Sequence, residues 1–318
     1  WQNAASHGLR ADLFSKGGIL FECAAFSLFY KEKPMGIIKS GIAAVSGFAA
    51  CAAFSYWQNN GMQTTYFNIK NEKLPNAFDG YRITQVSDLH DKWFGKAQNR
   101  LIRAVAATNP NLIVITGDLC DCRLDAAMAF IHGVIQLAPV CFVPGNHEAR
   151  SMVYGQLCRE LDRAGVVQLK NKRLLIHNNH DTICIAGVKD PAFYRKRTLK
   201  RDTPECVAAF SQYLKDLAQR QPNSDFTVLL SHRPEHFPLY VQNGFDLIFC
   251  GHAHGGQFRF PGVPGLYAPE QGILPQYTAG LYQRDGCTMV VSRGLGGSTF
   301  PQRIGNRPEL VCVTFKKH

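Results

Sequence analysis

The amino-acid sequence predicts an α/β layered fold, and two observations carry that prediction. Short apolar runs alternate with segments of helical spacing through the first half of the chain, and a portion rich in strands follows. Most of these runs are continuously apolar, which indicates strands that are covered on both faces. This order of elements is typical of a layered α/β domain.

The predicted strands are the short apolar runs. The first is "YRITQVSD", and "NLIVITGD" and "PVCFVPGN" follow it. A hairpin is predicted from "KRLLIHN" and "DTICIAGV", which are joined by the turn "NHD". The strands outside this hairpin are expected at 81–88, 111–118, 139–146, 225–232, 245–252, 287–294 and 310–317.

The predicted helices lie between these runs and carry apolar residues at helical spacing. The first ends before Asn109 and Pro110, because a proline disfavours the helical conformation of the residue before it. The third is closed by Gly165, a residue type that often ends helices. The helices are expected at 97–108, 124–137, 154–165 and near 205–219.

Composition supports one large globular domain and argues against disorder. The chain has 318 residues, of which 46% are hydrophobic and 19% charged, and we find no internal repeat. The formal net charge of +11 favours anionic partners such as phosphates, nucleic acid or an anionic membrane surface. The 11 cysteines are scattered without a CxxC pair, which indicates a reducing or an anaerobic environment rather than a disulfide scaffold.

The N-terminal part is predicted to be a separate unit. Residues 40–57 contain no charged side chain and end in Tyr56 and Trp57, which fits a short membrane span with interfacial aromatics. Basic residues precede this run and are absent for some distance after it, so the charge bias places the N-terminus inside and the rest of the chain across the membrane. We therefore expect an uncertain N-terminal extension at 1–34, a signal anchor at 35–60 and the catalytic domain at 61–318. The alternative is a buried Ala-rich helix of the globular domain.

Polar residues end five of the predicted strands. In α/β sheets, ligands gather beyond the carboxyl ends of the strands, so these side chains are expected to share one site. The five residues are Asp88, Asp118, Asn146, His232 and His252.

The stretch "FCGHAHGGQF" adds a second histidine two residues after His252. In an extended backbone, side chains at i and i+2 point the same way, so His252 and His254 are expected on one face. Neighbouring glycines allow the backbone to come close to whatever the two rings contact. A histidine pair alone is a weak metal signal, but the other strand ends supply partners for it.

The complete set of motifs contains carboxylate and imidazole donors and no thiolate. In chain order the motifs are "SDLH", "GDLCD", "GNHE", "SHRPEH" and "GHAH". Such donors suit Mn, Fe or Zn rather than Ca or a structural zinc site made of cysteines. The motifs and their order resemble the signature of calcineurin-like metallophosphoesterases, and the resemblance extends from about residue 80 to the C-terminus. The segment that follows "GHAH" is similar to a bacterial membrane-anchored branch that contains phosphodiesterases and UDP-2,3-diacylglucosamine pyrophosphohydrolases.

The resemblance implies a four-layer sandwich of two stacked mixed β-sheets flanked by helices. It also implies two divalent metal ions that share Asp118 as a bridging ligand. One ion would be held by Asp88, His90, Asp118 and His254, and the other by Asp118, Asn146, His232 and His252. Metal pairs of this kind lie roughly 3.5–4 Å apart and activate a shared water to hydroxide near neutral pH, which attacks phosphorus in line.

The resemblance also implies the catalytic roles of two further residues. His147 would contact the scissile phosphate and help the leaving oxygen to depart, and Asp121 would orient His147 and keep it cationic. From their positions near strand ends, Arg233 and Arg293 are interpreted either as contacts for the substrate phosphate, since guanidinium groups match phosphate geometry, or as ordinary surface residues. The basic run at 194–202 is interpreted either as a contact for an anionic head group or as a solvated loop.

The leading hypothesis is a membrane-anchored, two-metal phosphodiesterase or pyrophosphohydrolase, with Mn as one candidate metal. Its expected substrate is a phosphoester, including a lipid or a nucleotide-linked lipid, and its catalytic domain is expected outside the cytoplasm. The alternatives are a nuclease of the same superfamily and a catalytically silent metal-binding scaffold. The chain carries a predicted anchor and no appended nucleic-acid module, which argues against nucleic acid as the partner. The sequence indicates no particular oligomeric state.

Overall fold

The computed structural model describes residues 35–195, 202–219, 224, 226–297 and 300–317. The expected extension at 1–34 and most of the basic run at 194–202 lie outside the described residues. The chain divides into two units, Trp1–Ala53 and Phe54–His318. This division falls seven residues before the expected start of the catalytic domain at residue 61, so the end of the first described helix belongs to the second unit.

That helix, α2, runs from Met35 to Asn60. Its stretch Ser40–Asn60, 21 residues, is long and apolar enough to cross a membrane, and it is the one such helix among the described residues. None of the residues in its most apolar window is buried. The assignment of this segment as a signal anchor, rather than as a buried Ala-rich helix, stays a prediction.

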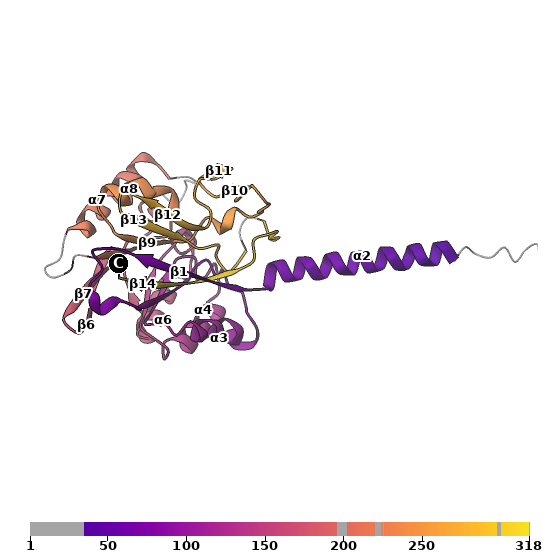
Figure 1. The fold of residues 1–318 in the computed structure, drawn as a ribbon, viewed down its shortest axis with the longest axis horizontal. Coiled ribbons are helices and arrows are strands. Elements are labelled where there is room, and N and C mark those ends of the chain that lie inside the picture. Colours follow the sequence, from indigo (N-terminus) through magenta and orange to yellow (C-terminus); the bar gives the residue numbers. More distant parts are fainter. Residues whose placement is uncertain (1–34, 196–201, 220–223, 225, 298–299, 318) are drawn as a thin grey trace, which may run out of the picture. The chain divides into compact units, whose positions relative to one another are not determined.

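Two six-stranded mixed sheets form the centre of the second unit, and Figure 1 labels several of their strands. The first sheet has the order β1-β14-β2-β3-β4-β5 and the second has the order β12-β13-β9-β8-β7-β6. The strands of the first sheet are β1 (Gln63–Lys70), β2 (Arg82–Val86), β3 (Leu112–Thr116), β4 (Val140–Val143), β5 (Val167–Gln168) and β14 (Glu309–Lys316). Those of the second are β6 (Lys172–Asn178), β7 (Asp181–Gly187), β8 (Thr227–Leu230), β9 (Leu247–Cys250), β12 (Gly280–Arg284) and β13 (Cys287–Val291).

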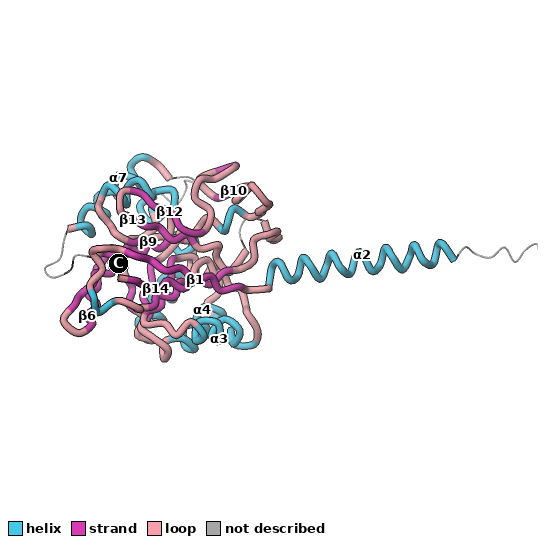
Figure 2. The backbone as a smooth tube through the Cα atoms, viewed as in Figure 1, coloured by secondary structure: helices cyan, strands magenta, loops and turns pink. Residues whose placement is uncertain are grey.

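Helices flank both sheets, and Figure 2 separates them from the strands by colour. They are α3 (Asn99–Ala107), α4 (Asp125–Val134), α5 (Asn146–Arg150), α6 (Tyr154–Arg163), α7 (Pro204–Ala218) and α8 (Phe237–Gln242). A small hairpin, β10 (Tyr267–Ala268) and β11 (Gly272–Ile273), stands apart from the two large sheets. The predicted fold class, two stacked mixed sheets flanked by helices, is therefore confirmed.

Three buried layers of side chains hold these elements together. Within β3, Ile113 and Ile115 pack with α3, α4 and α6, whereas Leu112 and Val114 face the second sheet. On the far side of the second sheet, Leu229 and other strand residues pack against α7 and α8. Because successive strand residues point to opposite faces, continuously apolar strands such as β3 serve two layers at once.

The predicted site residues follow the carboxyl ends of five strands. Strands β2, β3 and β4 are parallel neighbours in the first sheet, and β8 and β9 are parallel neighbours in the second. Each strand ends a few residues before its predicted end, so the polar residues lie in the segments that follow the strands, with Asn146 as the first residue of α5. The C-terminal strand β14 runs between β1 and β2, parallel to the first and antiparallel to the second.

Candidate metal centre

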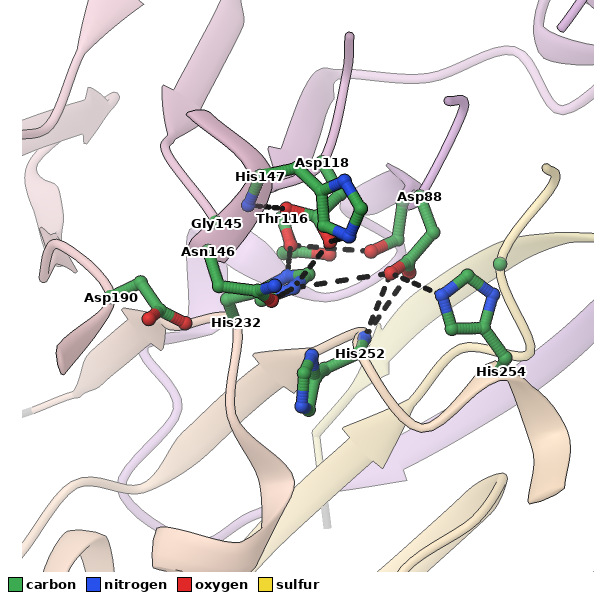
Figure 3. A network of polar contacts seen from close by, with 12 residues as sticks. Asp88, Thr116, Asp118, Gly145, Asn146, His147, Asp190, His232, His252 and His254 are labelled. Carbon is green, nitrogen blue, oxygen red and sulfur yellow. Dashed lines mark hydrogen bonds and ion pairs between the residues drawn. The ribbon is translucent and has the colours of Figure 1, made fainter. Parts of the chain in front are cut away.

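Carboxylates from the first sheet and imidazoles from the second meet in the loops beyond the strands (Figure 3). The Nε2 atom of His232 lies 3.1 Å from Oδ2 of Asp118 and 3.1 Å from Oδ1 of Asn146. The Nε2 atom of His254 lies 3.4 Å from Oδ1 of Asp88. Three clusters have donor atoms close enough to share a metal ion: Asp88, His90 and His254; His90, Asp118 and His147; and Asp118, His232 and His252.

The backbone at five of these residues is left-handed. The φ angles are 53° at Asp88, 48° at His90, 50° at Asp118, 65° at His252 and 47° at His254. Such angles are uncommon for residues other than glycine and cost of order 1–3 kcal/mol each, so the surrounding fold must hold them in place. The expectation that His252 and His254 share a face because of an extended backbone is therefore wrong. Strand β9 ends at Cys250, and the two histidines lie in a tight turn after it.

Two glycines let the loops of the two sheets approach each other. A Cβ atom at Gly117, which has a φ of +89°, would lie 2.6 Å from Nδ1 of His232. A Cβ atom at Gly251 would lie 2.4 Å from Oδ2 of Asp88. Both distances are shorter than any side-chain contact allows, so the glycine before Asp118 and the glycine before His252 are required by packing across the site.

His232 is fixed in one orientation by a backbone hydrogen bond. Its Nδ1–H donates to the carbonyl oxygen of Thr116 at 2.7 Å, which directs Nε2 toward Asp118 and Asn146. Metal-binding histidines are held in this way, with one ring nitrogen as a donor and the other free to coordinate. Burial opposes a charge on His232, but the carboxylate of Asp118 outweighs it and raises the pKa of His232 to about 10, so a metal ion would have to displace a proton from Nε2.

The other ring nitrogens also suit a cation. Burial lowers the pKa of His252, as does the nearby charge of Arg233, and burial together with His90 lowers the pKa of His254. Both rings are therefore neutral, the form of imidazole that binds metal ions. Among the described residues, the buried Nε2 of His90 has no hydrogen-bond partner, and it lies 3.7 Å from Oδ2 of Asp118. An orphaned buried nitrogen beside a carboxylate fits a metal ligand.

Asp121 binds two histidines rather than one. Its Oδ1 accepts hydrogen bonds from Nδ1 of His90 and from Nδ1 of His147, each at 2.7 Å. The His147 side chain is 41% exposed, whereas that of His90 is 5% exposed, so only His147 faces open solvent. Burial lowers the pKa of His147, but the charges of Asp118 and Asp121 outweigh it and raise the pKa to about 9. The imidazole of His147 is thus a proton donor at neutral pH.

Glu148 supports the site in a way that the sequence interpretation did not assign. Its carboxylate is buried and accepts four backbone N–H groups, from Asp118 at 2.8 Å, Leu119 at 2.7 Å, Cys120 at 3.1 Å and Gly145 at 2.8 Å. Burial and the nearby Asp118 raise the pKa of Glu148 to about 7. The available signal was its place in "GNHE", the third position of α5, where a glutamate closes a capping box.

The two arginines expected at the substrate have carboxylate partners. Arg233 is fully buried, with Nε 2.6 Å from Oδ2 of Asp190 and Nη1 3.1 Å from Nε2 of His252. Arg293 binds Glu309, with Nη2 2.6 Å from Oε1. Neither lines the cavity of about 780 Å³ that contains the cluster, whereas Arg150 at the end of α5 does. Their assignment to the substrate stays a prediction.

The small hairpin lines part of this cavity. Besides the cluster, the lining includes Tyr267, Pro269, Glu270, Gln271 and Gly272 of the β10–β11 region, and Gly297. The candidate site is therefore a cavity lined by carboxylates and imidazoles and, in part, by a separate hairpin.

Comparison with known proteins gives consistent matches. A family model described as calcineurin-like phosphoesterase matches residues 81–256. The chain is 27% identical over 274 residues to the uncharacterized metallophosphoesterase YkuE of Bacillus subtilis, covering 82% of this chain and 88% of that protein.

A transmembrane protein with metallophosphoesterase domain from Danio rerio is 26% identical over 307 residues, covering 93% of this chain and 65% of that protein. The UDP-2,3-diacylglucosamine pyrophosphatase LpxG of Chlamydia trachomatis is 23% identical over 283 residues, covering 71% of this chain and 82% of that protein. Among solved structures, the protein TT1561 of Thermus thermophilus matches with a TM-score of 0.45 and 13% identity, covering 68% of this chain and 90% of that one.

Proposed function

Because this chain belongs to the calcineurin-like phosphoesterase family, we propose that it is a two-metal-dependent hydrolase of phosphodiesters or pyrophosphates. The observation that carries the proposal is the convergence of oxygen and nitrogen donors from two sheets beneath an open cavity, with His147 exposed in it. The donors include no thiolate, so a hydrolytic site with divalent cations fits better than a structural zinc site.

The residues present fit two divalent cations that share Asp118. The clusters of Asp88, His90 and His254 and of Asp118, His232 and His252 support one ion each, and Asn146 lies beside His232 in the second cluster. When bound, such cations lower the pKa of water and stabilise negative charge on phosphoryl oxygens. Mn, Fe and Zn all accept this set of ligands.

His147 is proposed to donate the proton to the leaving oxygen. Its Nδ1 is hydrogen-bonded to Asp121, which leaves Nε2 directed toward the cavity at 4.0 Å from Oδ2 of Asp118. A raised pKa keeps the proton on the ring at neutral pH, and transfer to an alkoxide removes the charge that develops as the P–O bond breaks. Arg150, which lines the same cavity, is proposed to contact the non-bridging phosphate oxygens.

The proposed location is a membrane, with α2 as a single N-terminal anchor and the catalytic unit on the extracytoplasmic side. The length and apolar composition of Ser40–Asn60 support the anchor, and the relative from Danio rerio is named as a transmembrane protein. A lipid-linked phosphoester as substrate is supported by the name of the chlamydial relative, a pyrophosphatase of a diacylated sugar nucleotide.

The test is an activity screen of the full chain with Mn, Zn and Mg. Its substrates are bis-p-nitrophenyl phosphate, p-nitrophenyl phosphate and single-stranded DNA, and Asp118→Asn is the control. We expect metal-dependent hydrolysis of the diester that the variant lacks. Hydrolysis of DNA alone would indicate a nuclease, and the absence of both bound metal and turnover would indicate a silent scaffold.

A further inference from the structure

Exposed apolar side chains surround the outer face of the β10–β11 hairpin. We call this group the apolar rim, and it consists of Leu266, Ile273, Leu274 and Phe300. Ile273 is 77% exposed and Leu274 is 66% exposed, values that no core or packing role explains. Contiguous exposed apolar side chains of this kind mark contact surfaces for proteins or membranes.

The members of the apolar rim are neighbours in space. Tyr267 pairs with Ile273 across the hairpin, and the N–H of Leu274 donates to the carbonyl of Leu266 at 2.9 Å. The ring of Phe300 lies 6.4 Å from that of Tyr267 and 6.0 Å from that of Phe258. Segments from two parts of the chain therefore build one surface.

This surface borders the mouth of the metal site. Tyr267 and Gly272, which belong to the hairpin strands, line the 780 Å³ cavity together with the turn between them. The same short hairpin thus presents polar turn residues to the cavity and apolar residues to solvent. Whatever covers the apolar rim also lies at the entrance to the site.

The end of α2 is attached to the segment that carries Phe300. The hydroxyl of Ser55 donates to Oε1 of Gln302 at 2.5 Å, and the N–H of Arg303 donates to Oδ1 of Asn59 at 2.8 Å. A second cavity, of about 450 Å³, is lined by Asn59 and Asn60 and also by His90 and Asp121 of the site. The last turn of the helix is therefore close to both the metal site and the apolar rim.

Basic side chains surround this helix end. Lys92 donates to the carbonyl of Asn59, and Arg100 donates to that of Asn60 at 3.2 Å. Arg307 donates to the carbonyl of Gly61 at 2.6 Å, and its guanidinium lies 4.5 Å from the ring centroid of Trp57. Cations next to an interfacial tryptophan, directly after an apolar helix, are the arrangement found at the headgroup level of a bilayer.

We propose that the apolar rim docks on the bilayer that holds α2, and that the substrate is a phosphoester whose acyl chain remains in that bilayer. The proposal rests on the proposed hydrolase function and on α2 as an anchor. If a bilayer contains α2 as far as Trp57, then Lys92, Arg100 and Arg307 lie at its headgroup level. The apolar rim, joined to the same point through Phe300 and Gln302, can then enter the interface by the few ångströms that interfacial segments reach.

The docking is tested by fluorescence quenching on the full chain in phosphatidylcholine–phosphatidylglycerol vesicles. Leu274→Trp places a probe on the apolar rim, and Leu137→Trp places one at an exposed site before β4, at the edge of the sheet opposite the metal cluster. With lipids brominated in the acyl chains, we expect the added fluorescence at position 274 to be quenched and that at 137 to be unchanged. Equal quenching at the two positions, or protection at 274 that depends on protein concentration as in a dimer, overturns the proposal.

The substrate class is tested with two diesters that share one leaving group. Ethyl p-nitrophenyl phosphate is soluble, and hexadecyl p-nitrophenyl phosphate is presented in the same vesicles. We expect the double variant Ile273→Asp and Leu274→Asp to lower kcat/KM for the hexadecyl ester by about tenfold or more and to leave the ethyl ester unchanged, because neither residue belongs to the catalytic machinery. Leu137→Asp should leave both rates unchanged. Equal changes on the two esters contradict the proposal.

These two measurements separate failure of the inference from failure of the proposed function. If the unsubstituted chain hydrolyses neither ester with Mn, Zn or Mg, the hydrolase proposal fails, while the quenching experiment still decides whether the apolar rim enters the bilayer. If it hydrolyses both esters but the probe at 274 is not quenched, the hydrolase proposal stands and the docking proposal is wrong.

Discussion

The two sheets supply different chemistry to the same site. Segments after β2, β3 and β4 of the first sheet supply the carboxylates, the amide and the imidazoles of His90 and His147, whereas loops after β8 and β9 of the second supply only imidazoles. Asp118 and His232 show what this division does. Burial opposes both charges, yet neighbouring imidazoles such as His232 hold the pKa of Asp118 well below its usual range, and Asp118 raises that of His232. The buried charged group that each sheet supplies therefore stabilises the charged group of the other sheet.

The positive charge of the neighbouring imidazoles does not fully compensate the burial of Asp88. Burial raises the pKa of Asp88, because the charge of His232 does not offset the cost of burying a second carboxylate next to Asp118. The imidazoles of His252 and His254 are neutral and cannot supply the missing positive charge. A site with excess buried negative charge and neutral nitrogen donors favours divalent cations, which bring that charge from outside.

Asp118 interacts with ligands from both sheets, so its substitution should have the largest effect on turnover. Asp118→Asn removes the charge that the two proposed metal ions would share with His232, and we expect turnover to fall to the background rate while the fold persists. The measurement is diester hydrolysis with circular dichroism, and Asp125→Asn, on an exposed carboxylate, is the control. Near-normal turnover in Asp118→Asn would contradict the shared-ligand arrangement.

Substitutions of the two histidines in "GHAH" should remove different metal ions. His252→Ala and His254→Ala each remove one ligand, from different clusters. We expect each variant to bind about one metal equivalent where the unsubstituted chain binds two, and excess metal to restore part of the activity. Elemental analysis of the purified variants measures this. If both variants lose the same ion, or neither loses any, the assignment of one histidine to each ion fails.

His147 should show a loss of chemistry without a loss of metal. His147→Ala removes a proton donor that faces the cavity, and one such donor is typically worth about 10²–10³ in turnover. The loss should be smaller for p-nitrophenolate, a good leaving group, than for an alkyl leaving group. Metal content and turnover on one substrate of each type decide the matter, and a variant that loses a metal ion or loses equally on both substrates contradicts this role.

Glu148 tests whether the first sheet needs internal support to present Asp118. Glu148→Gln replaces one acceptor oxygen by a donor, which leaves some of the four backbone N–H groups without a partner. We expect the free energy of unfolding to fall by about 1–3 kcal/mol. Glu160→Gln, on the surface of α6, should change it by less than about 0.5 kcal/mol. Denaturant unfolding compares the two, and equal stability would show that the buried carboxylate is not required.

The smallest effect is expected from removing the helix end, which touches neither set of ligands. A chain that starts at Phe54 keeps the contacts of Ser55 with Gln302 and of Trp57 with Arg307, whereas a chain that starts at Gln58 loses both. Both should hydrolyse a soluble diester, since the metal motifs begin at Asp88. The shorter chain should be less stable by about 1–2 kcal/mol. Thermal unfolding measures the difference, and an insoluble shorter chain would show that the segment belongs to the fold.

Sequence patterns were sufficient to predict the buried strands and the types of residue that gather at the site. Strands such as β3 and β9 carry continuous apolar runs because both faces are covered, and their polar neighbours stand out. The edge strands β1 and β12 were missed, because their exposed faces carry polar residues that break the pattern. The left-handed backbone of the ligand loops, the second partner of Asp121 and the burial of Arg233 depend on contacts between distant segments, which local patterns do not report.

The position of β14 makes the support of the site depend on contacts between segments that are far apart in the sequence. β14 pairs along its whole length with β1 and separates it from β2. Without β14, β1 has no partner among the described strands, and β2, which leads to Asp88, is an open edge. Such long-range pairing forms late in folding. The segment that carries Asp88 therefore gains its full support only after the distant β14 has folded onto β2.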